Sequence, residues 1–337
     1  MARAALGSVL ALAVAVGLAS CGGAGESPGP TSTPPTTSPT APPTASPTRP
    51  ISGPTSADLP LTVAVTVPIF GDFVRQIGGE NVKVFSLLPA DADPHTHKLT
   101  AEELGRIAEA DFFFVNGLGL DDAITELIEE NRREDAKVIP FAPNIRSPRG
   151  QELGDYELTA QEADDNPHLW LDPMLARTYA EIVADTFDIY DGVNKSFYDG
   201  NFSTYRDRIS QLDLEIRAEL ERIPPENRKL ITLHDSFEHF ARRYGLEVIG
   251  FVVADPQQRP DEDNVAQLAE TVRAQGVPAV FAEHGFDRDV IERVAAEAGV
   301  QVCNLYSDIV DETAPTYEEM MRSNIQEIAG CLGGTGG

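Results

Sequence analysis

The histidines are the first candidates for functional residues in this chain, because a neutral imidazole binds transition metals and exchanges protons near neutral pH. The 337 residues contain only six histidines. Three of them, His95, His168 and His234, occupy loops or strand ends in distant parts of the chain, and Asp308 follows the last apolar run in the same way. Three imidazoles and a carboxylate can bind a divalent metal ion if the fold brings them together. None of the four belongs to a local Cys/His or His-Glu-x-x-His pattern, so spacing alone does not establish a site.

Short apolar runs that alternate with helical patterns must position these side chains. Most of the runs are continuously apolar, which is typical of parallel strands buried on both faces. Four strand–helix units, a gap and four more runs predict an α/β protein with two lobes, each with a mainly parallel four-stranded sheet flanked by helices. Ligands bind beyond the carboxyl ends of such strands. The predicted strands are 61–66, 82–87, 111–116, 137–141, 229–234, 247–253, 278–283 and 300–306, and the predicted helices between them are 70–77, 101–110, 120–132, 237–244, 264–275 and 288–298.

Two helices fill the gap between the two sets of strands. The first begins at Pro173, in a position where proline favours a first helical turn, and extends to about Tyr190. The second extends from about Lys195 to Ile223, carries one continuous apolar stripe, and is roughly 40 Å long at 1.5 Å per residue. Its place between the two sets of strands favours a rigid helix that joins the lobes. A long helix on the surface is the alternative interpretation. The apolar stripe consists of Tyr198, Phe202, Tyr205, Ile209, Leu212, Ile216, Leu220 and Ile223.

The N-terminus has the pattern of a targeting segment. An apolar run of 13 residues, 6–18, is too short to span a bilayer as a mature helix. The run ends in Leu18-Ala19-Ser20-Cys21, which resembles a bacterial lipobox and predicts lipidation of Cys21. The alternative is an ordinary cleavage site with an incidental cysteine. The Pro/Ser/Thr-rich stretch 22–60 then predicts a disordered tether, so we expect the folded part to be held at the outer face of a membrane.

Charge and cysteine content narrow the class of protein. The formal net charge of −28 argues against a nucleic-acid-binding protein, which needs a basic face, and suits a protein that handles cations or one that must stay soluble and monomeric. Two cysteines remain besides Cys21, and an even pair in an exported protein predicts a disulfide between Cys303 and Cys331. Two free buried thiols are the alternative.

Several motifs together make the stretch from about Leu61 to Leu332 similar to a known family. It resembles the zinc/manganese substrate-binding proteins of bacterial ABC transporters, the ZnuA/TroA-like family. The resemblance implies two lobes joined by one long helix, a single metal ion between them, and a membrane permease as partner. The motifs are Asp93-Pro94-His95, Asn166-Pro167-His168-Leu169-Trp170-Leu171-Asp172-Pro173, Tyr198-x-x-Asn201, Leu233-His234-Asp235-Ser236-Phe237, Leu305-Tyr306-Ser307-Asp308 and Tyr317-x-x-Met320-Met321-x-x-Asn324.

The resemblance also implies a ligand set, at the positions occupied here by His95, His168, His234 and Asp308. Three imidazoles and one carboxylate suit tetrahedral Zn²⁺. Manganese-binding members tend to carry Glu where this chain has His234, and Mn²⁺ favours oxygen ligands, so we expect zinc rather than manganese. Four protein ligands close the site to a catalytic water, and an enzyme such as a zinc hydrolase is not expected.

The chain departs from the family pattern at the loop that often carries many histidines in zinc-binding members. The corresponding residues, 147–165, contain acidic residues and no histidine, which leaves an acidic flap near the site or a plain solvated loop as alternatives. His97 replaces a residue that is usually aromatic and is a candidate alternative ligand. Glu283, at a strand end, and Asp235, beside His234, are candidates for orienting the ligands.

The sequence thus predicts a lipid-anchored, extracytoplasmic protein that captures Zn²⁺ with high affinity and delivers it to an ABC permease for import. A manganese-binding homologue and a surface adhesin with a structural zinc are the alternatives, and a metallochaperone is a further candidate partner. The expected organisation is a signal peptide 1–21, a tether 22–60, an N-terminal lobe 61–194, a linking helix 195–223 and a C-terminal lobe 224–337.

Overall fold

Continuously apolar runs become parallel strands in the computed structural model, which describes residues 60–90, 92–145, 166–253 and 262–333. These residues belong to one compact unit. The predicted signal peptide with Cys21, the tether up to residue 59 and the acidic loop 147–165 lie outside the described residues.

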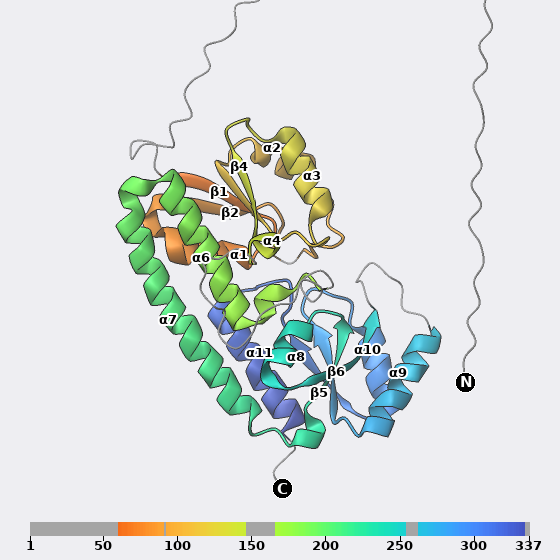
Figure 1. Cartoon of the computed structure of the whole chain (residues 1–337). Coiled ribbons are helices and arrows are strands. Elements are labelled where there is room, and N and C mark those ends of the chain that lie inside the picture. The colour runs from red at the N-terminus through yellow and green to blue at the C-terminus, as the bar shows by residue number, and fades with distance from the viewer. Residues whose placement is uncertain (1–59, 91, 146–165, 254–261, 334–337) are drawn as a thin grey trace, which may run out of the picture. The chain divides into compact units, whose positions relative to one another are not determined.

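The first half of the described chain contains one four-stranded parallel sheet with the order β2-β1-β3-β4 (Figure 1). Its central strands, β1 and β3, are apolar except for Thr62 because both faces are covered. Phe113 packs with α2 and α3 side chains on one face, and Phe112 and Phe114 pack toward α1 and α6 on the other. The elements are β1 (Leu61–Val65), α1 (Phe70–Gly78), η1 (Gly79–Asn81), β2 (Val82–Ser86), α2 (Ala101–Ile107), β3 (Phe112–Val115), α3 (Asp122–Asn131), β4 (Lys137–Pro140) and α4 (Phe141–Asn144).

The second half contains two parallel pairs, β5–β6 and β7–β8, where the sequence predicts one continuous sheet. β5 and β7 still lie side by side. At their carboxyl ends the Glu283 carboxylate accepts hydrogen bonds from the backbone N–H groups of Leu233 and His234, so a side chain joins the two strands there. The elements are η4 (Pro225–Asn227), β5 (Lys229–His234), α8 (Glu238–Tyr244), β6 (Glu247–Val253), α9 (Glu262–Gln275), β7 (Ala279–Glu283), α10 (Asp289–Ala298), β8 (Gln301–Leu305) and α11 (Tyr317–Leu332).

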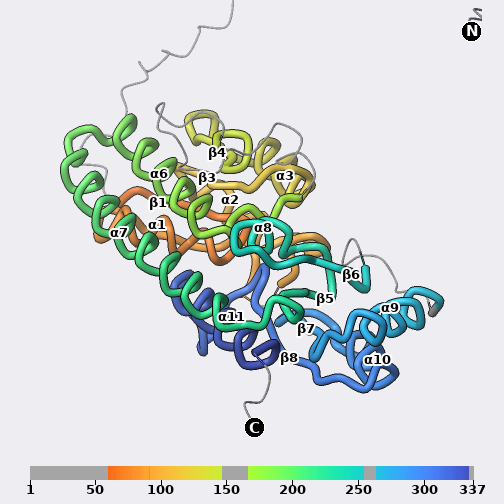
Figure 2. Tube along the Cα trace, turned by 60° about the horizontal axis from the view of Figure 1, so that its bottom comes forward, coloured from red at the N-terminus to blue at the C-terminus, as the bar shows by residue number. Residues whose placement is uncertain are grey.

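A single long helix, α7 (Lys195–Leu220), runs along both halves (Figures 1 and 2). It packs on α1 and on α6 (Pro173–Tyr190) of the first half and on α11 of the second. The predicted stripe faces inward, since all of its members are buried except the half-buried Phe202. Two short turns, η2 (Leu169–Leu171) and η3 (Gly192–Asn194), precede α6 and α7. The α/β class with parallel sheets and one long helix is therefore confirmed, while the residue limits of the two lobes stay a prediction.

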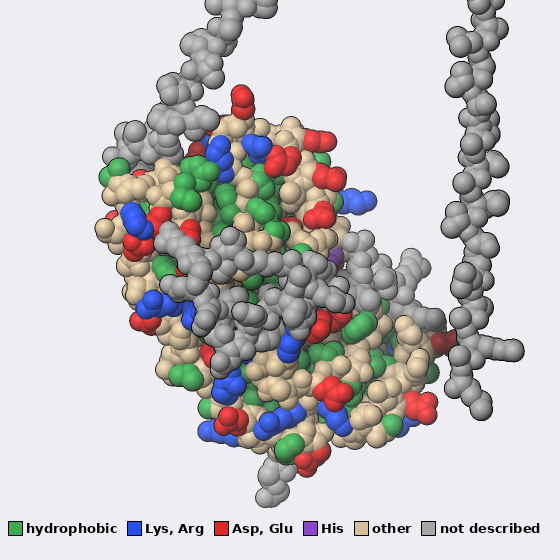
Figure 3. Space-filling model, in the orientation of Figure 1, with side chains coloured by type: hydrophobic (Ala, Val, Ile, Leu, Met, Phe, Trp, Pro, Cys, Tyr) green, Lys and Arg blue, Asp and Glu red, His purple; other side chains and the backbone are tan. Residues whose placement is uncertain are grey.

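Many charged side chains lie on the surface, and acidic and basic groups are interspersed over the face shown in Figure 3. One hydrophobic cluster continues from the first half into the second. At that junction the rings of Phe73 and Tyr317 lie 5.2 Å apart, and the backbone N–H of Tyr317 donates to the Asp72 carboxylate over 3.0 Å. The two halves are thus joined by a shared core as well as by α7.

The predicted disulfide is present and joins Cys303 in β8 to Cys331 in α11. Its sulfur atoms are therefore unavailable as thiolate ligands, although Cys303, Glu327 and Cys331 lie close enough together for a metal ion. The bond fixes the last helix to the strand that leads to Asp308.

Replacing Cys303 and Cys331 together with alanine should lower the free energy of unfolding by about 3–4 kcal/mol, because the bond closes a loop of 28 residues in the unfolded chain. Urea denaturation monitored by circular dichroism measures this loss. Wild-type protein unfolded in the presence of a reductant should show the same loss. An unchanged midpoint in both samples would show that the disulfide does not restrict the unfolded chain.

Candidate metal centre

Four side chains from distant segments meet at the carboxyl ends of the strands. His95 lies in the loop after β2, His168 lies just before η2, His234 is the last residue of β5, and Asp308 follows β8. One ligand atom from each lies within 4.8 Å of the corresponding atom of every other. The structure thus brings together the four residues that the sequence singled out.

The three imidazoles face one another through the same ring atom. His168 Nε2 lies 3.3 Å from His95 Nε2 and 3.2 Å from His234 Nε2. The Asp308 carboxylate closes the group, with Oδ1 lying 3.3 Å from His168 Nε2 and Oδ2 lying 3.4 Å from His234 Nε2. Three ring nitrogens and a carboxylate at these separations form a donor set that one divalent cation can share.

Asn166 fixes the orientation of His168. The Asn166 Oδ1 atom accepts hydrogen bonds from the His168 backbone N–H, over 3.0 Å, and from His168 Nδ1, over 2.9 Å. An amide oxygen can only accept, so Nδ1 carries the proton and Nε2 presents its lone pair. The Asn166 amide nitrogen in turn donates to the Asp235 backbone carbonyl over 2.9 Å. Sequence analysis missed this role, although an Asn two residues before the histidine is a common signal for such a turn.

Glu283 performs the corresponding task for His234. Its Oε2 atom lies 3.0 Å from His234 Nδ1 and accepts a hydrogen bond from the Ser236 hydroxyl over 3.0 Å. With Oε1 bonded to two backbone N–H groups of β5, this carboxylate holds both the ring of His234 and the strand that carries it. Glu283 thus lies against the ring of His234, and its role in orienting a ligand stays a prediction.

His95 is the half-buried member of the group, while the other three are buried. A turn centred on Asp93 shapes its loop. The Asp93 carboxylate accepts hydrogen bonds from the His95 backbone N–H, over 2.8 Å, and from the Thr96 hydroxyl, over 2.7 Å. His95 therefore lies on the side of the group that is nearest to solvent.

The remaining candidate residues lie elsewhere. His97 Nε2 lies 3.1 Å from Glu103, which completes the N-terminal cap of α2, so the ring of His97 is engaged away from the four ligand atoms. Asp235 contacts Asn166 rather than an imidazole and so acts on His168 only indirectly. His284 stacks on Tyr306, with ring centroids 3.9 Å apart.

Burial and charge shift the titration of the group in opposite directions. Burial lowers the pKa of His168 from its usual value of 6.5, and the charge of Asp308 offsets this only in part. For His234 the same burial is outweighed by Glu283 and Asp308, which raise its pKa well above 6.5. Burial raises the pKa of Asp308, but His168 and His234 outweigh burial and hold that pKa well below 3.8. The centre therefore favours a positive charge, which a divalent cation can supply.

Two α/β halves spanned by one long helix, with a closed set of metal donors at the strand ends, define a substrate-binding protein of the metal-transport class. The chain belongs to the ZnuA family, described as zinc-uptake complex component A, periplasmic, which matches residues 63–331. It is therefore a metal-binding component of an ABC transporter, with a membrane permease as partner, and not an enzyme.

Individual relatives agree on the class and differ in the metal they name. The manganese-binding lipoprotein MntA of Halalkalibacterium halodurans is 26% identical over 277 residues, covering 81% of this chain and 88% of the relative. The manganese ABC transporter substrate-binding lipoprotein PsaA of Streptococcus pneumoniae is 26% identical over 277 residues, which cover 80% of this chain and 88% of PsaA. The structure of the periplasmic zinc-binding protein TroA from Treponema pallidum matches with a TM-score of 0.73 and 25% identity, covering 81% of this chain and 99% of TroA. In the part of the chain that the structure describes, we find no helix with the length and apolar character needed to span a membrane.

We predict that His168, His234 and Asp308 together make the metal-free protein lose stability both as pH falls below 6.5 and as pH rises above 6.5. Because the pKa of Asp308 is lowered, its stabilising effect is present above pH 3.8 and is lost as the pH falls through this lowered pKa. The lowered pKa of His168 adds a cost as pH falls below 6.5. The raised pKa of His234 means that its effect is complete below 6.5 and is lost as pH rises through the raised value.

Urea denaturation in a metal chelator, repeated from about pH 4 to about pH 9, measures this dependence. A His234→Gln variant should lack the alkaline loss and is the matched control. A wild-type curve that stays flat above pH 6.5 would contradict the prediction.

Proposed function

We propose that the chain captures Zn²⁺ outside the cytoplasm with His95, His168, His234 and Asp308 and delivers it to an ABC permease for import. The observation that carries the proposal is the convergence of three imidazole Nε2 atoms and one carboxylate within 4.8 Å. The number and type of these donors match a four-coordinate zinc site, which has no free position for catalysis. We further propose that a lipid on Cys21 holds the protein at the membrane through the stretch 22–60.

The choice of zinc depends on His234. Three nitrogen donors and one oxygen donor favour the softer Zn²⁺, whereas Mn²⁺ prefers more oxygen donors. Glu283 supports this choice, because a carboxylate facing Nδ1 makes the imidazole of His234 a better Nε2 donor. Manganese is the second candidate, since the relatives MntA and PsaA are named for it, whereas TroA is named for zinc.

Capture and release follow from the position of the ligands. The ion enters on the side of the half-buried His95, and the three buried ligands then replace its water. Capture requires neutral imidazoles, so the affinity falls as pH drops through the range in which they take up protons. Because the ligands come from both halves of the described chain, a permease that contacts both halves can separate them and release the ion.

His168→Ala should lower the affinity for Zn²⁺ by more than about 100-fold, because changes in groups that merely orient a ligand already cost about 10–100-fold. Competition titration against a chelator of known affinity measures the change, and native mass spectrometry with elemental analysis gives the metal and its stoichiometry. His97→Ala is the matched control, since it removes an imidazole two residues from His95, and it should leave the affinity unchanged. Unchanged zinc affinity in His168→Ala would remove that residue from the site.

His234→Glu should lower the ratio of zinc to manganese affinity by at least about tenfold, because an oxygen donor replaces a nitrogen donor. The ratio is the appropriate measure, since zinc binds more tightly than manganese to most sites of this kind. Both affinities are obtained by competition titration of the wild-type and variant proteins. Wild-type protein in which equimolar Mn²⁺ displaces Zn²⁺ would overturn the choice of zinc, and an unchanged ratio in the variant would show that His234 does not determine it.

A further inference from the structure

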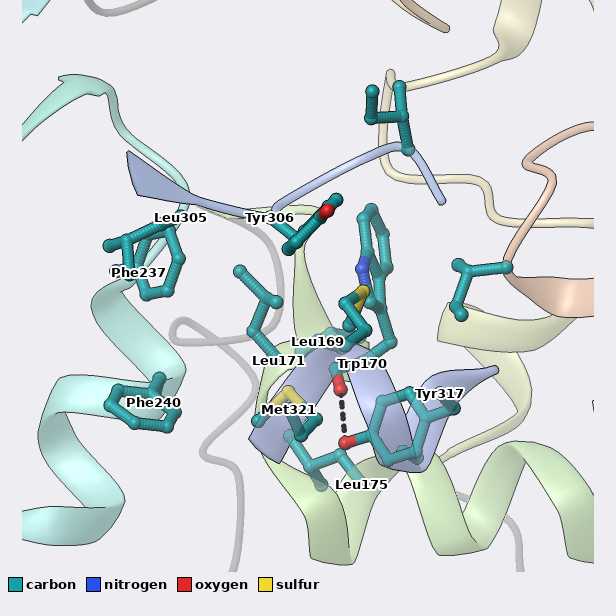
Figure 4. Packing of buried hydrophobic residues seen from close by; sticks show 14 of the residues in the cluster. Leu169, Trp170, Leu171, Leu175, Phe237, Phe240, Leu305, Tyr306, Tyr317 and Met321 are labelled. Atoms are coloured by element: carbon teal, nitrogen blue, oxygen red, sulfur yellow. Dashed lines mark hydrogen bonds between the residues drawn. The ribbon is translucent and has the colours of Figure 1, made fainter. Parts of the chain in front are cut away.

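Trp170 lies at the junction of the two segments that supply His168 and Asp308. It is the only tryptophan of the chain and is fully buried in η2, two residues after His168. Figure 4 shows its indole ring standing upright between η2 and the segment that contains Tyr306. Its contacts therefore reach elements that are distant in the sequence.

The indole nitrogen holds the segment that carries Asp308. Trp170 Nε1 donates to the backbone carbonyl of Ser307 over 2.9 Å, across 137 positions of sequence. The Ser307 hydroxyl donates to Asp308 Oδ2 over 2.9 Å. Ser307 thus accepts the hydrogen bond of the indole N–H and donates one to the candidate carboxylate ligand.

A second hydrogen bond holds the backbone of Trp170 itself. The Tyr317 hydroxyl donates to the Trp170 carbonyl over 2.8 Å (Figure 4). Tyr317 is the first residue of α11, and its backbone N–H donates to Asp72 in α1. Trp170 is therefore anchored at its backbone and at its ring nitrogen, to the two segments that flank Asp308 in the sequence.

The indole ring also packs against the other ligand. The centroids of the His168 and Trp170 rings lie 5.2 Å apart, and the Phe70 ring packs edge-on against Trp170 with a centroid distance of 5.4 Å. His168 is thus held by Asn166 through a hydrogen bond and by Trp170 through packing.

We propose that Trp170 is a positioning residue that sets the separation of His168 and Asp308 before a cation enters. The inference rests on the proposed function and extends it, because it assigns the preformed spacing of the site to one indole N–H group. A ligand set held at a fixed spacing loses less freedom when it binds, and the bound ion leaves more slowly. A loosened carboxylate should also discriminate less between Zn²⁺ and the larger Mn²⁺, which requires more ligands.

The sharpest test replaces Trp170 with benzothienylalanine, in which a sulfur atom takes the place of the indole N–H and the ring shape is kept. Loss of one hydrogen bond should speed zinc dissociation about 2–10-fold and lower the zinc-to-manganese affinity ratio. Stopped-flow mixing of the zinc-loaded protein with an excess of chelator measures the rate. Tyr317→Phe removes only the hydroxyl that holds the Trp170 carbonyl and should change the rate in the same direction, which provides a second variant if the first fails to fold.

Tyr198→Phe is the control, because it removes a comparable buried hydrogen bond, to Asp191, at the start of α7. It should lower stability and leave zinc dissociation unchanged. A wild-type dissociation rate in the Trp170 and Tyr317 variants would overturn the inference and leave the proposed function standing. Equal acceleration in Tyr198→Phe would reduce the role of Trp170 to general stability and overturn the inference too. Wild-type protein that binds neither ion would overturn the proposed function, and the inference with it.

Discussion

Two buried carboxylates, Asp308 and Glu283, impose the central constraint on this structure. A carboxylate removed from water is costly unless positive charge or several hydrogen bonds compensate it. Glu283 accepts hydrogen bonds from two backbone N–H groups and one hydroxyl. Asp308 faces the Nε2 atoms of two imidazoles and accepts a hydrogen bond from one hydroxyl. The strand ends, the loops and the packing of the two halves hold these carboxylates together with the imidazoles. A cation bound there would compensate their negative charge.

The parallel strands place the site, and the helices make it rigid. Because parallel strands end at the same edge, His234 at the end of β5 and Asp308 after β8 arrive at one place although they are far apart in sequence. α7 and the shared core then keep the two halves in contact through many buried side chains rather than through one hinge. The four proposed ligands thus lie close together on a rigid frame.

Much of this could be predicted from the sequence because its signals are local. Apolar runs, most of them continuous, indicated all eight strands of the described chain, and the apolar stripe that begins at Tyr198 indicated the buried face of the long helix, which ends at Leu220 rather than at the predicted Ile223. The ligand set was different, since no local spacing links residues so far apart and only the family motifs joined them. The orienting contacts were harder still. Asn166, rather than Asp235, holds His168 directly, and Glu103 engages His97, because these contacts depend on loop conformations that no periodic pattern specifies.

The single indole of the chain lies against the ring of His168, with the two ring centroids 5.2 Å apart. All tryptophan emission from this protein therefore originates within a few ångströms of one candidate ligand, without background from other parts of the fold. A cation at the proposed site would change the charge and the motion of this neighbouring imidazole, and the tryptophan fluorescence of the unlabelled protein would then report its arrival and departure.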